Sequence, residues 1–178
     1  MPAALTTSRF NKIFNQYRHR VYGFAYHYLN SSESAADVTQ DVFVRLWNHR
    51  DSVDEDRLIG WLLRVTRNAC VDAIRRRKAY EKRVETNTDV LMEKADQSPL
   101  PDAQAESSIF QEHLRKALDT LEEPHKSIVV LREIQEYKYQ EISEVLDIPL
   151  NTVKVYLHRA RKALRKELNE RMDIEYVG

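Results

Sequence analysis

The stretch that decides the fold is YQEISEVLDIPLNTVKVYLHRARKALRKEL, residues 139–168. Its first part, from about Tyr139 to Leu146, has apolar residues at the spacing of a helix with one buried face: Ile142, Val145 and Leu146. The segment Asp147–Pro149 interrupts this pattern, and Pro149 is tolerated in the first turn of a new helix. Two helices joined by so short a turn are typical of a helix-turn-helix.

The second helix of this motif separates an apolar face from a basic one. Its apolar residues are Val153, Leu157, Ala160, Leu164 and Leu168. Between Asn151 and Lys166 there is no acidic residue, and the basic ones are Lys154, Arg159, Arg161, Lys162, Arg165 and Lys166. Because DNA is a polyanion and its major groove admits one α-helix, this pattern favours DNA binding. The alternative is a basic face that is simply solvated.

Three helices are predicted ahead of this motif, in the N-terminal part of the chain. The first ends near Asn30, and its stripe is Phe10, Ile13, Phe14, Tyr17, Val21, Phe24 and Tyr28. The second is capped by Ser31 or Ser32 and runs to about Trp47, with Val38, Val42, Phe43 and Leu46 as its apolar side. The third starts near Arg57, ends in the basic run Arg75–Lys78, and is expected to bury Trp61, Leu62, Val65, Ala69 and Ala73.

Periodicity fades over residues 81–107, where acidic residues accumulate and Pro99 and Pro101 disfavour helix. Helical patterning then returns before the helix-turn-helix. With only three glycines and five prolines in 178 residues, the sequence predicts an all-α protein of two domains joined by a flexible linker. The N-terminal domain, with three helices, spans residues 8–80, the linker 81–107, and the C-terminal domain, with four helices, 108–170.

Composition excludes several other classes of protein. The lone Cys70 lies in an apolar helical stretch and is expected to be a small core residue. The six histidines have no metal-ligand spacing, and no set of nucleophile, base and metal ligands supports catalysis, so no cofactor, metal or enzymatic activity is expected. The sequence has no long apolar run and no leader, which favours a cytoplasmic protein that does not insert into membranes.

Two parts of the chain resemble the extracytoplasmic-function (ECF) group of bacterial sigma-70 factors. Residues 35–47 and 61–76 are similar to region two of that group. Residues 152–154 and 157–162 are similar to its region-four recognition helix. The order of the parts also agrees, so the resemblance extends from about Phe10 to Leu168.

The resemblance implies a dissociable subunit of RNA polymerase. Such a subunit brings the core enzyme, with its β′ and β subunits, to the minus-thirty-five and minus-ten elements of a promoter and helps to open the strands. Catalysis would belong entirely to the core. An anti-sigma factor is implied as a further partner, and no small-molecule substrate is expected.

The resemblance also implies roles for individual residues. Those expected to bind core, at the clamp helices of β′, are Asp37, Gln40, Asp41, Arg45 and Trp47. Those expected at the minus-ten element, beside a loop from about Asp51 to Leu58 that holds an extruded base, are Arg64, Arg67, Asn68, Arg75 and Arg76. Those expected at the minus-thirty-five element are Asn151, Thr152, Lys154, Val155, His158, Arg159, Arg161 and Lys162.

Some of these residues have alternative roles in the fold. Phe43 and Trp47 could be core, Asn68 could bond locally, and Arg161 could stabilise the domain. The run Arg75–Lys78 could complement a helix dipole.

The chain departs from the common pattern of the group at three places. Val155 and Tyr156 stand where serine and arginine are frequent, so the promoter sequence does not follow from the resemblance. Asp147 replaces a frequent glycine, so a slightly different turn is expected. Ala36 stands where an acid is usual, which weakens one expected polar contact with core.

Two rival functions remain compatible with the sequence. One is an independent helix-turn-helix regulator that dimerises through its first helix and binds a palindrome. The other is a sigma-like decoy that captures an anti-sigma factor. The basic and polar residues at Arg64, Asn68 and Lys154 speak against the decoy, because a mimic has no need of them.

Overall fold

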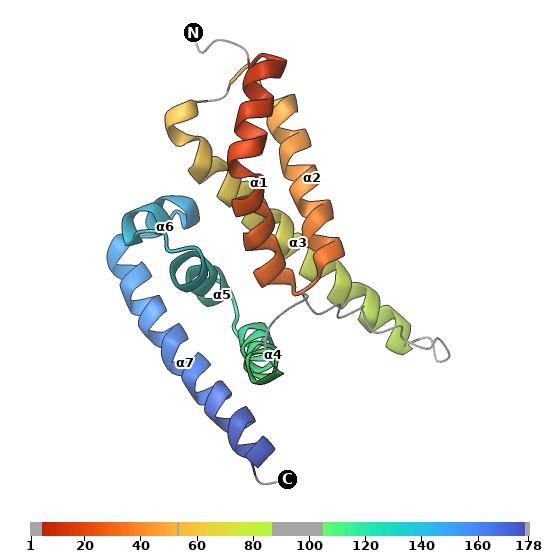
Figure 1. Ribbon diagram of the computed structural model, residues 1–178, viewed down its shortest axis with the longest axis vertical. Helices are drawn as coiled ribbons and strands as arrows, with labels where there is room; N and C mark the ends of the chain where they lie inside the picture. The colour runs from red at the N-terminus through yellow and green to blue at the C-terminus, as the bar shows by residue number, and fades with distance from the viewer. Residues whose placement is uncertain (1–4, 53, 87–104, 177–178) are drawn as a thin grey trace. The chain divides into compact units, whose positions relative to one another are not determined.

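The computed structural model describes residues 5–52, 54–86 and 105–176, and all regular structure in these ranges is helical. The chain divides into two compact units, unit 1 (Met1–Ser98) and unit 2 (Pro99–Gly178). Figure 1 shows their helices in the colour order of the chain. The predicted all-α fold is therefore confirmed, while the exact domain boundaries stay a prediction.

Unit 1 is a bundle of three long helices. They are α1 (Thr7–Leu29), α2 (Ser32–Asn48) and α3 (Leu58–Thr86), with a short 3-10 turn, η1 (Glu55–Arg57), before α3. Each helix buries one apolar face against the other two, and the large side chains in this core include Val21, Phe24, Val42, Leu46, Leu62 and Leu63. Burial of one such side chain stabilises a fold by roughly 1.5–3 kcal/mol, so this core holds the bundle together.

The connection between α1 and α2 is as short as the sequence predicts. Asn30 ends α1 in the left-handed conformation, with φ 54°, and its N–H donates to the Tyr26 carbonyl at 2.8 Å. The Ser31 hydroxyl oxygen then accepts a hydrogen bond from the Ser34 N–H at 3.2 Å, which caps α2. Of the two predicted caps, the structure selects Ser31.

The buried face of α3 differs from the predicted one. Leu62 and Ala69 are buried as expected, whereas Trp61, Val65 and Ala73 are only half-buried. Leu58, Leu63, Thr66 and Cys70 complete the buried face. Thr66 tolerates burial because its hydroxyl donates to the Leu62 carbonyl at 2.6 Å. A polar residue at the centre of the face had obscured the apolar pattern in the sequence.

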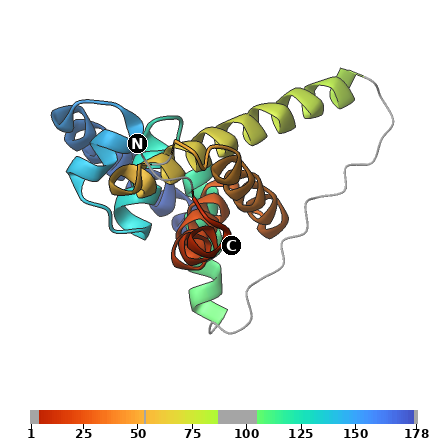
Figure 2. The ribbon, with the colours of Figure 1, turned by 90° about the horizontal axis from the view of Figure 1, so that it is seen from above.

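Helix α3 also extends further than predicted. It continues to Thr86, six residues into the range expected to be linker. Figure 2 shows its C-terminal part running past the ends of α1 and α2. The remaining linker residues 87–104 lie outside the described part of the chain, and α4 begins at Ala105.

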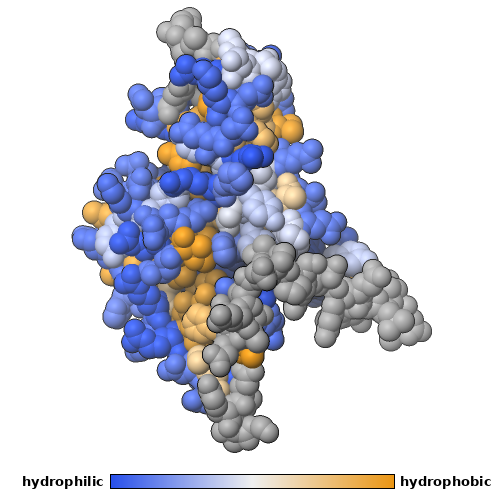
Figure 3. Space-filling view, in the orientation of Figure 1, coloured by the Kyte–Doolittle hydropathy of each residue, from blue (hydrophilic) through white to orange (hydrophobic). Residues whose placement is uncertain are grey.

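Unit 2 contains the four predicted helices and a π-helical turn. They are α4 (Ala105–Asp119), α5 (His125–Val129), α6 (Tyr139–Leu146) and α7 (Leu150–Tyr176), and α5 runs directly into the π turn η2 (Val130–Ile134). The core joins α4, α5 and α7 through Leu118, Val129 and Ala160. Figure 3 shows further apolar surface on unit 2 between α7 and α4.

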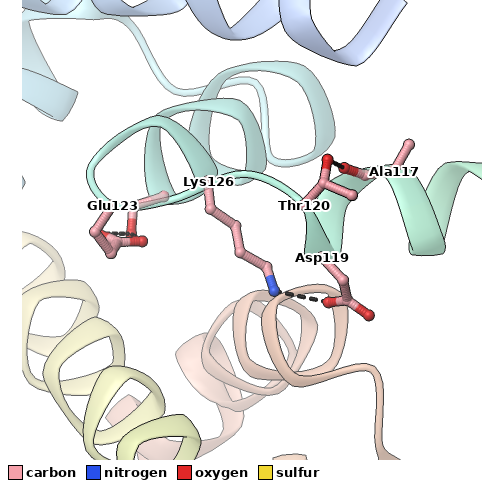
Figure 4. Close-up of polar contacts among 6 residues, drawn as sticks. Ala117, Asp119, Thr120, Glu123 and Lys126 are labelled. Atoms are coloured by element: carbon pink, nitrogen blue, oxygen red, sulfur yellow. Dashed lines mark hydrogen bonds and ion pairs between the residues drawn. The ribbon is translucent and has the colours of Figure 1, made fainter. Parts of the chain in front are cut away.

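A buried ammonium group ties the end of α4 to α5. Lys126 is only 4% exposed, and its Nζ lies 2.8 Å from Oδ1 of Asp119, as Figure 4 shows. On the same segment, the Ser127 hydroxyl donates to the Glu123 carboxylate at 2.7 Å. Because a buried charge is costly without a partner, this ion pair favours a conformation in which the end of α4 lies next to the start of α5.

The turn of the helix-turn-helix forms around Asp147. This residue caps α6 in the left-handed conformation, with φ 54° and ψ 47°. The Ser143 hydroxyl donates to the Ile148 carbonyl at 2.6 Å and closes the turn. Asp147 thus adopts the conformation that glycine favours, so the expected change in the turn does not occur there. Pro149 lies directly before α7 instead of in its first turn.

The corrected face of α3 leads to a stability prediction. Leu63→Ala should lower the free energy of unfolding of unit 1 by about 2–5 kcal/mol, because it leaves a cavity in the core. Val65→Ala should cost less, because Val65 is only half-buried. Urea unfolding can be followed by the fluorescence of Trp47 and Trp61, the two tryptophans of the chain, which both lie in unit 1. If Val65→Ala lowered the free energy of unfolding more than Leu63→Ala does, the buried face would be the one predicted from sequence.

Candidate nucleic-acid and protein interfaces

Helix α7 has a buried face and an opposite basic face, as the sequence predicts. Val153, Leu157 and Ala160 are buried, whereas Leu164 and Leu168, which were expected to continue the buried stripe, are only half-buried. The exposed residues on the other side are Asn151, Lys154, Val155, His158, Arg159 and Lys162, and Thr152 is half-buried. Val155 is 47% exposed although it is apolar, so it is available to a partner. The structure therefore brings these predicted DNA contacts together on one helix.

Arg161, which is also predicted to contact DNA, forms an ion pair within unit 2. Its Nε and Nη2 donate to Oε1 of Glu133 at 3.0 and 2.6 Å. Glu133 lies in the π turn η2, so the ion pair connects the recognition helix α7 to the end of the α5–η2 segment. This arrangement supports the alternative in which Arg161 serves the fold.

Three further contacts position the helix-turn-helix and were not found from sequence. The Arg132 guanidinium donates to the Tyr137 carbonyl at 2.9 Å and lies 4.8 Å from the centre of the Tyr139 ring. The ring of Tyr156 lies 5.0 Å from that of His125, at the start of α5. Tyr156 is half-buried, so packing explains why an aromatic residue can replace the frequent arginine. The one signal in the sequence was the type of residue, because arginine and histidine often pack on the ring of a tyrosine.

Helix α3 presents a polar face opposite its core. Arg64, Asn68 and Arg75 are exposed and recur at intervals of four and seven residues, which places them on one side of the helix. Arg67 is half-buried and its Nη1 donates to Oδ1 of Asn68 at 3.3 Å. Asn68 is therefore bonded locally, as its alternative role predicted, but remains exposed. Arg76 is exposed on a neighbouring side, and its Nε donates to the Asp72 carbonyl at 3.4 Å.

The loop before α3 is acidic and exposed in its described residues. Asp54 accepts a hydrogen bond from the Asp56 N–H at 3.1 Å and lies 3.9 Å from Nε of Arg57. The rings of His49 and Trp61 lie 6.0 Å apart, which connects the end of α2 to the start of α3. Asn68 is ten residues after Leu58, or about 15 Å along the helix axis. Asn68 is thus nearly three helical turns beyond the end of the loop, instead of directly beside it as expected.

The exposed face of α2 carries the predicted protein contacts. Asp37, Gln40, Asp41 and Arg45 are all exposed, and Arg45 pairs with Asp41 at 2.8 Å. Trp47 is half-buried between Phe10, with ring centres 5.1 Å apart, and the Arg50 guanidinium at 5.0 Å.

Two other residues of α2 add to this description, one whose role the sequence left open and one that it did not indicate. Phe43 is only 3% exposed and its ring lies 4.8 Å from that of Phe14, so it belongs to the core. Val44 is 52% exposed, one turn beyond Gln40 and Asp41, and was missed. An apolar residue at helical spacing within an otherwise polar face is the pattern that could have identified it.

Within the described residues, no group of three or more histidine, cysteine or acidic side chains could hold a metal ion. Cys70 is buried, as expected for a small core residue. In the part of the chain that the structure covers, no helix is long and apolar enough to cross a bilayer.

Comparisons with known proteins identify the family to which both parts of the chain are similar. The sigma-70 region 2 family matches residues 13–80, and the sigma-70 region 4 family matches residues 111–164. The ECF RNA polymerase sigma factor SigW of Bacillus subtilis is 30% identical over 167 residues, which cover 90% of this chain and 89% of SigW. The chain belongs to the ECF group of the sigma-70 family. It directs promoter-specific initiation of transcription, and neither the independent regulator nor the decoy is favoured.

A second relative and a solved structure are also similar to this sigma factor. The ECF sigma factor SigE of Mycolicibacterium smegmatis is 32% identical, over 89% of this chain and 61% of SigE. In structure, the sigma factor RpoE in a complex with the anti-sigma factor NepR from Bartonella quintana aligns with a TM-score of 0.71 at 20% identity, covering 90% of this chain and 96% of RpoE. This structural likeness supports the fold. Sigma factors as a family are not enzymes.

The ion pair between η2 and α7 leads to a prediction about unit 2. In a double-mutant cycle with Glu133→Ala and Arg161→Ala, the coupling free energy should be about 0.2–1 kcal/mol, because both side chains are partly exposed to water. Urea unfolding followed by far-UV circular dichroism would measure it. Strictly additive effects would show that the pair does not brace the recognition helix.

Proposed function

We propose that this sigma factor binds promoter DNA through the polar faces of α3 and α7 and polymerase core through the exposed face of α2. The observation that carries this proposal is the two-faced character of α3 and α7. Each helix buries an apolar face in its own unit and exposes cations together with amide or imidazole groups on the other. Cations hold phosphates and amides bond base edges, so both helices have the chemistry for DNA.

In unit 2, α7 would enter the major groove of the minus-thirty-five element. Lys154, Val155, His158 and Arg159 would contact base edges, since they are exposed on the outer face. Asn151 and Thr152 lie in the first turn, where N–H groups are available to phosphates. Lys162 would contact phosphates further along. Arg161 would mainly position α7, because a phosphate contact would have to compete with Glu133.

In unit 1, the face of Arg64, Asn68 and Arg75 would bind the minus-ten element. Arg67 holds the Asn68 amide oxygen, which leaves the amide nitrogen to donate to a base. The loop before α3 would contact an extruded base of the non-template strand, about 15 Å from Asn68 along the helix. Arg76 would contact the backbone from the adjacent side.

The face of α2 would dock on the clamp helices of the polymerase β′ subunit. Its polar residues Asp37, Gln40 and Asp41 lie on the same side of the helix as the exposed apolar side chain of Val44, in the turns before it, and Arg45 and Trp47 lie within three residues of Val44. An apolar centre with a polar rim is the usual anatomy of a protein interface. In unit 2, the exposed apolar residues Ile109, Phe110 and Met172 would bind the β subunit.

An anti-sigma factor is a further proposed partner, in view of the complex in which RpoE was solved. The chain would act in the cytoplasm, where core polymerase and the chromosome are found. Because sigma factors are not enzymes as a family, the core would perform all catalysis, with no small-molecule substrate or cofactor on this chain.

The function is tested by mixing the purified chain with bacterial core RNA polymerase and transcribing a pool of promoter fragments. Binding to core together with transcripts that depend on the chain supports the proposal and yields the promoter sequence. Specific binding to duplex DNA without core, and no binding to core, would instead identify an independent regulator.

The recognition helix leads to a prediction about promoter preference. Lys154→Ala or Arg159→Ala should each reduce binding to the minus-thirty-five element by about 1–3 kcal/mol, if the side chain contacts a base. Comparing transcription from promoters with intact and altered elements would measure this effect. Arg171→Ala is a control on the same helix, because Arg171 is paired with Glu167 far from the first turns. If both variants still distinguished intact from altered minus-thirty-five elements as well as the original chain does, Lys154 and Arg159 would not contact bases.

The exposed face of α2 leads to a prediction about core binding. Asp41→Ala combined with Arg45→Ala should weaken the affinity for core while the helical content stays the same, because both side chains are exposed. Fluorescence anisotropy of a labelled chain titrated with core would measure the affinity. Lys12→Ala, an exposed cation of α1, is the control. An unaltered affinity in the double variant would show that Asp41 and Arg45 do not belong to the surface that binds core.

A further inference from the structure

The exposed face of α7 is bordered by two different flanks. Successive residues of an α-helix are rotated by about 100°, so the residues around Val155 can be assigned to one flank or the other. Lys154 and Arg165 lie on one flank, which is cationic. Thr152 and Tyr156 lie on the other, which carries hydroxyl groups instead of cations in the early part of α7. The first turns of the recognition helix therefore offer charge to DNA on one flank only.

Helix α5 packs against the flank that lacks cations, and Figure 1 shows α5 beside α7. The ring of His125 lies 5.0 Å from that of Tyr156, with the two planes inclined by 47°. Both side chains are half-buried, so the pair lies at the border between the packed and the exposed sides of α7. Among the described residues, neither ring has a hydrogen-bonding partner. The Tyr156 hydroxyl and the His125 ring nitrogens are therefore available to a ligand.

Two of the three carboxylates in the connection before α5 have partners within unit 2. Glu123 accepts hydrogen bonds from the Ser127 hydroxyl at 2.7 and 2.8 Å. Asp119 is paired with the buried Lys126 at 2.8 Å. Glu122, the third carboxylate, is exposed. An anion beside the start of α5 would therefore meet at most one carboxylate whose charge is not offset by a neighbour.

We propose that the His125 imidazole and the Tyr156 hydroxyl together bind one backbone phosphate at the minus-thirty-five element, on the flank of α7 next to α5. This inference rests on the proposed function of α7. A helix in the major groove has the backbone of one strand on each side, so both of its flanks can meet phosphates. Arg165 has the charge for one backbone, and the ring pair has the hydrogen-bond donors for the other. Tyr156 stands where arginine is frequent in the group, so two donors from two helices would here replace one cation.

The position of the pair favours a phosphate over a base edge. Val155 and Arg159 are exposed near the centre of the outer face, where a helix meets the bases. Tyr156 is rotated by about 100° from Val155 and packs on His125, so it would meet the wall of the groove, which is formed by the sugar and phosphate groups. Phenol and imidazole groups donate hydrogen bonds to phosphate oxygens without selecting a base. The contact would therefore fix the position of α7 in the groove at any minus-thirty-five sequence.

The test uses holoenzyme, formed from core polymerase and the full chain, and duplex fragments of a promoter recovered from the transcription pool. In one set of fragments, a single phosphate at each position in and beside the minus-thirty-five element is replaced by an uncharged methylphosphonate. The variants are Tyr156→Phe, His125→Phe and the two combined, because phenylalanine keeps a ring at each position and removes the polar atoms. Tyr17→Phe, which removes the hydroxyl of another half-buried tyrosine, in α1 of unit 1, is the matched control.

On the unmodified fragment, the double variant should bind about tenfold more weakly than the original chain, the scale of a hydrogen bond to a charged group. Each single variant should lose part of this affinity. One methylphosphonate position should weaken binding of the original chain by a similar factor and leave the double variant nearly unaffected, because that variant has already lost the contact. The control should behave like the original chain on every fragment.

Two results would overturn the inference. One is equal binding of the double variant and the original chain to the unmodified fragment. The other is a loss of affinity in the double variant that stays the same at every methylphosphonate position, because the rings would then act only through packing.

A failure of the proposed function would look different. In that case the original chain would not bind core, or its holoenzyme would not prefer a fragment with the intact minus-thirty-five element over one with an altered element. Weaker binding of the double variant to core in the absence of DNA would contradict the inference, because the rings would then contact protein.

Discussion

The packing of α3 against α1 and α2 determines where the charged side chains of unit 1 can lie. Leu62, Leu63 and Thr66 must face the bundle, so Arg64, Asn68 and Arg75 are forced to the opposite side. The same helix is thus both the structural centre of the unit and its proposed DNA surface. A site built on such a helix is held rigidly, since any rotation of the polar face would also move the core.

Unit 2 uses some of its charges for folding and leaves others for binding. Lys126 is buried with Asp119, Arg161 pairs with Glu133, and Arg132 lies over Tyr139. These contacts connect α4 to α5 and hold η2 against the helix-turn-helix. Lys154, Arg159 and Lys162, by contrast, are exposed on α7. In a sequence these cations look alike, and only the positions of the carboxylates in space distinguish them.

Helical periodicity predicted the order of the helices and the two faces of α7, because its apolar stripe has no interruption. It failed in part on α3, where the buried Thr66 broke the stripe and Trp61 and Val65 appeared to continue it. Phe43 could not be assigned from sequence, since an aromatic residue suits both a core and an interface. In the structure its ring packs against those of Phe10 and Phe14, so it belongs to the core. The partnership of Arg161 with Glu133 spans 28 residues and depends on a π turn that no local pattern indicated.

The separation of roles on α7 has a consequence for evolution. Lys154, Val155 and His158 project from the surface, whereas Val153, Leu157 and Ala160 hold the helix in place. Substitutions at exposed positions usually change stability by less than about 0.5 kcal/mol. After a gene duplication, the exposed residues of α7 could therefore change so that the helix recognises a new promoter sequence. No compensating change in the core would be needed. Two copies of such a protein could come to control separate sets of genes while sharing one polymerase.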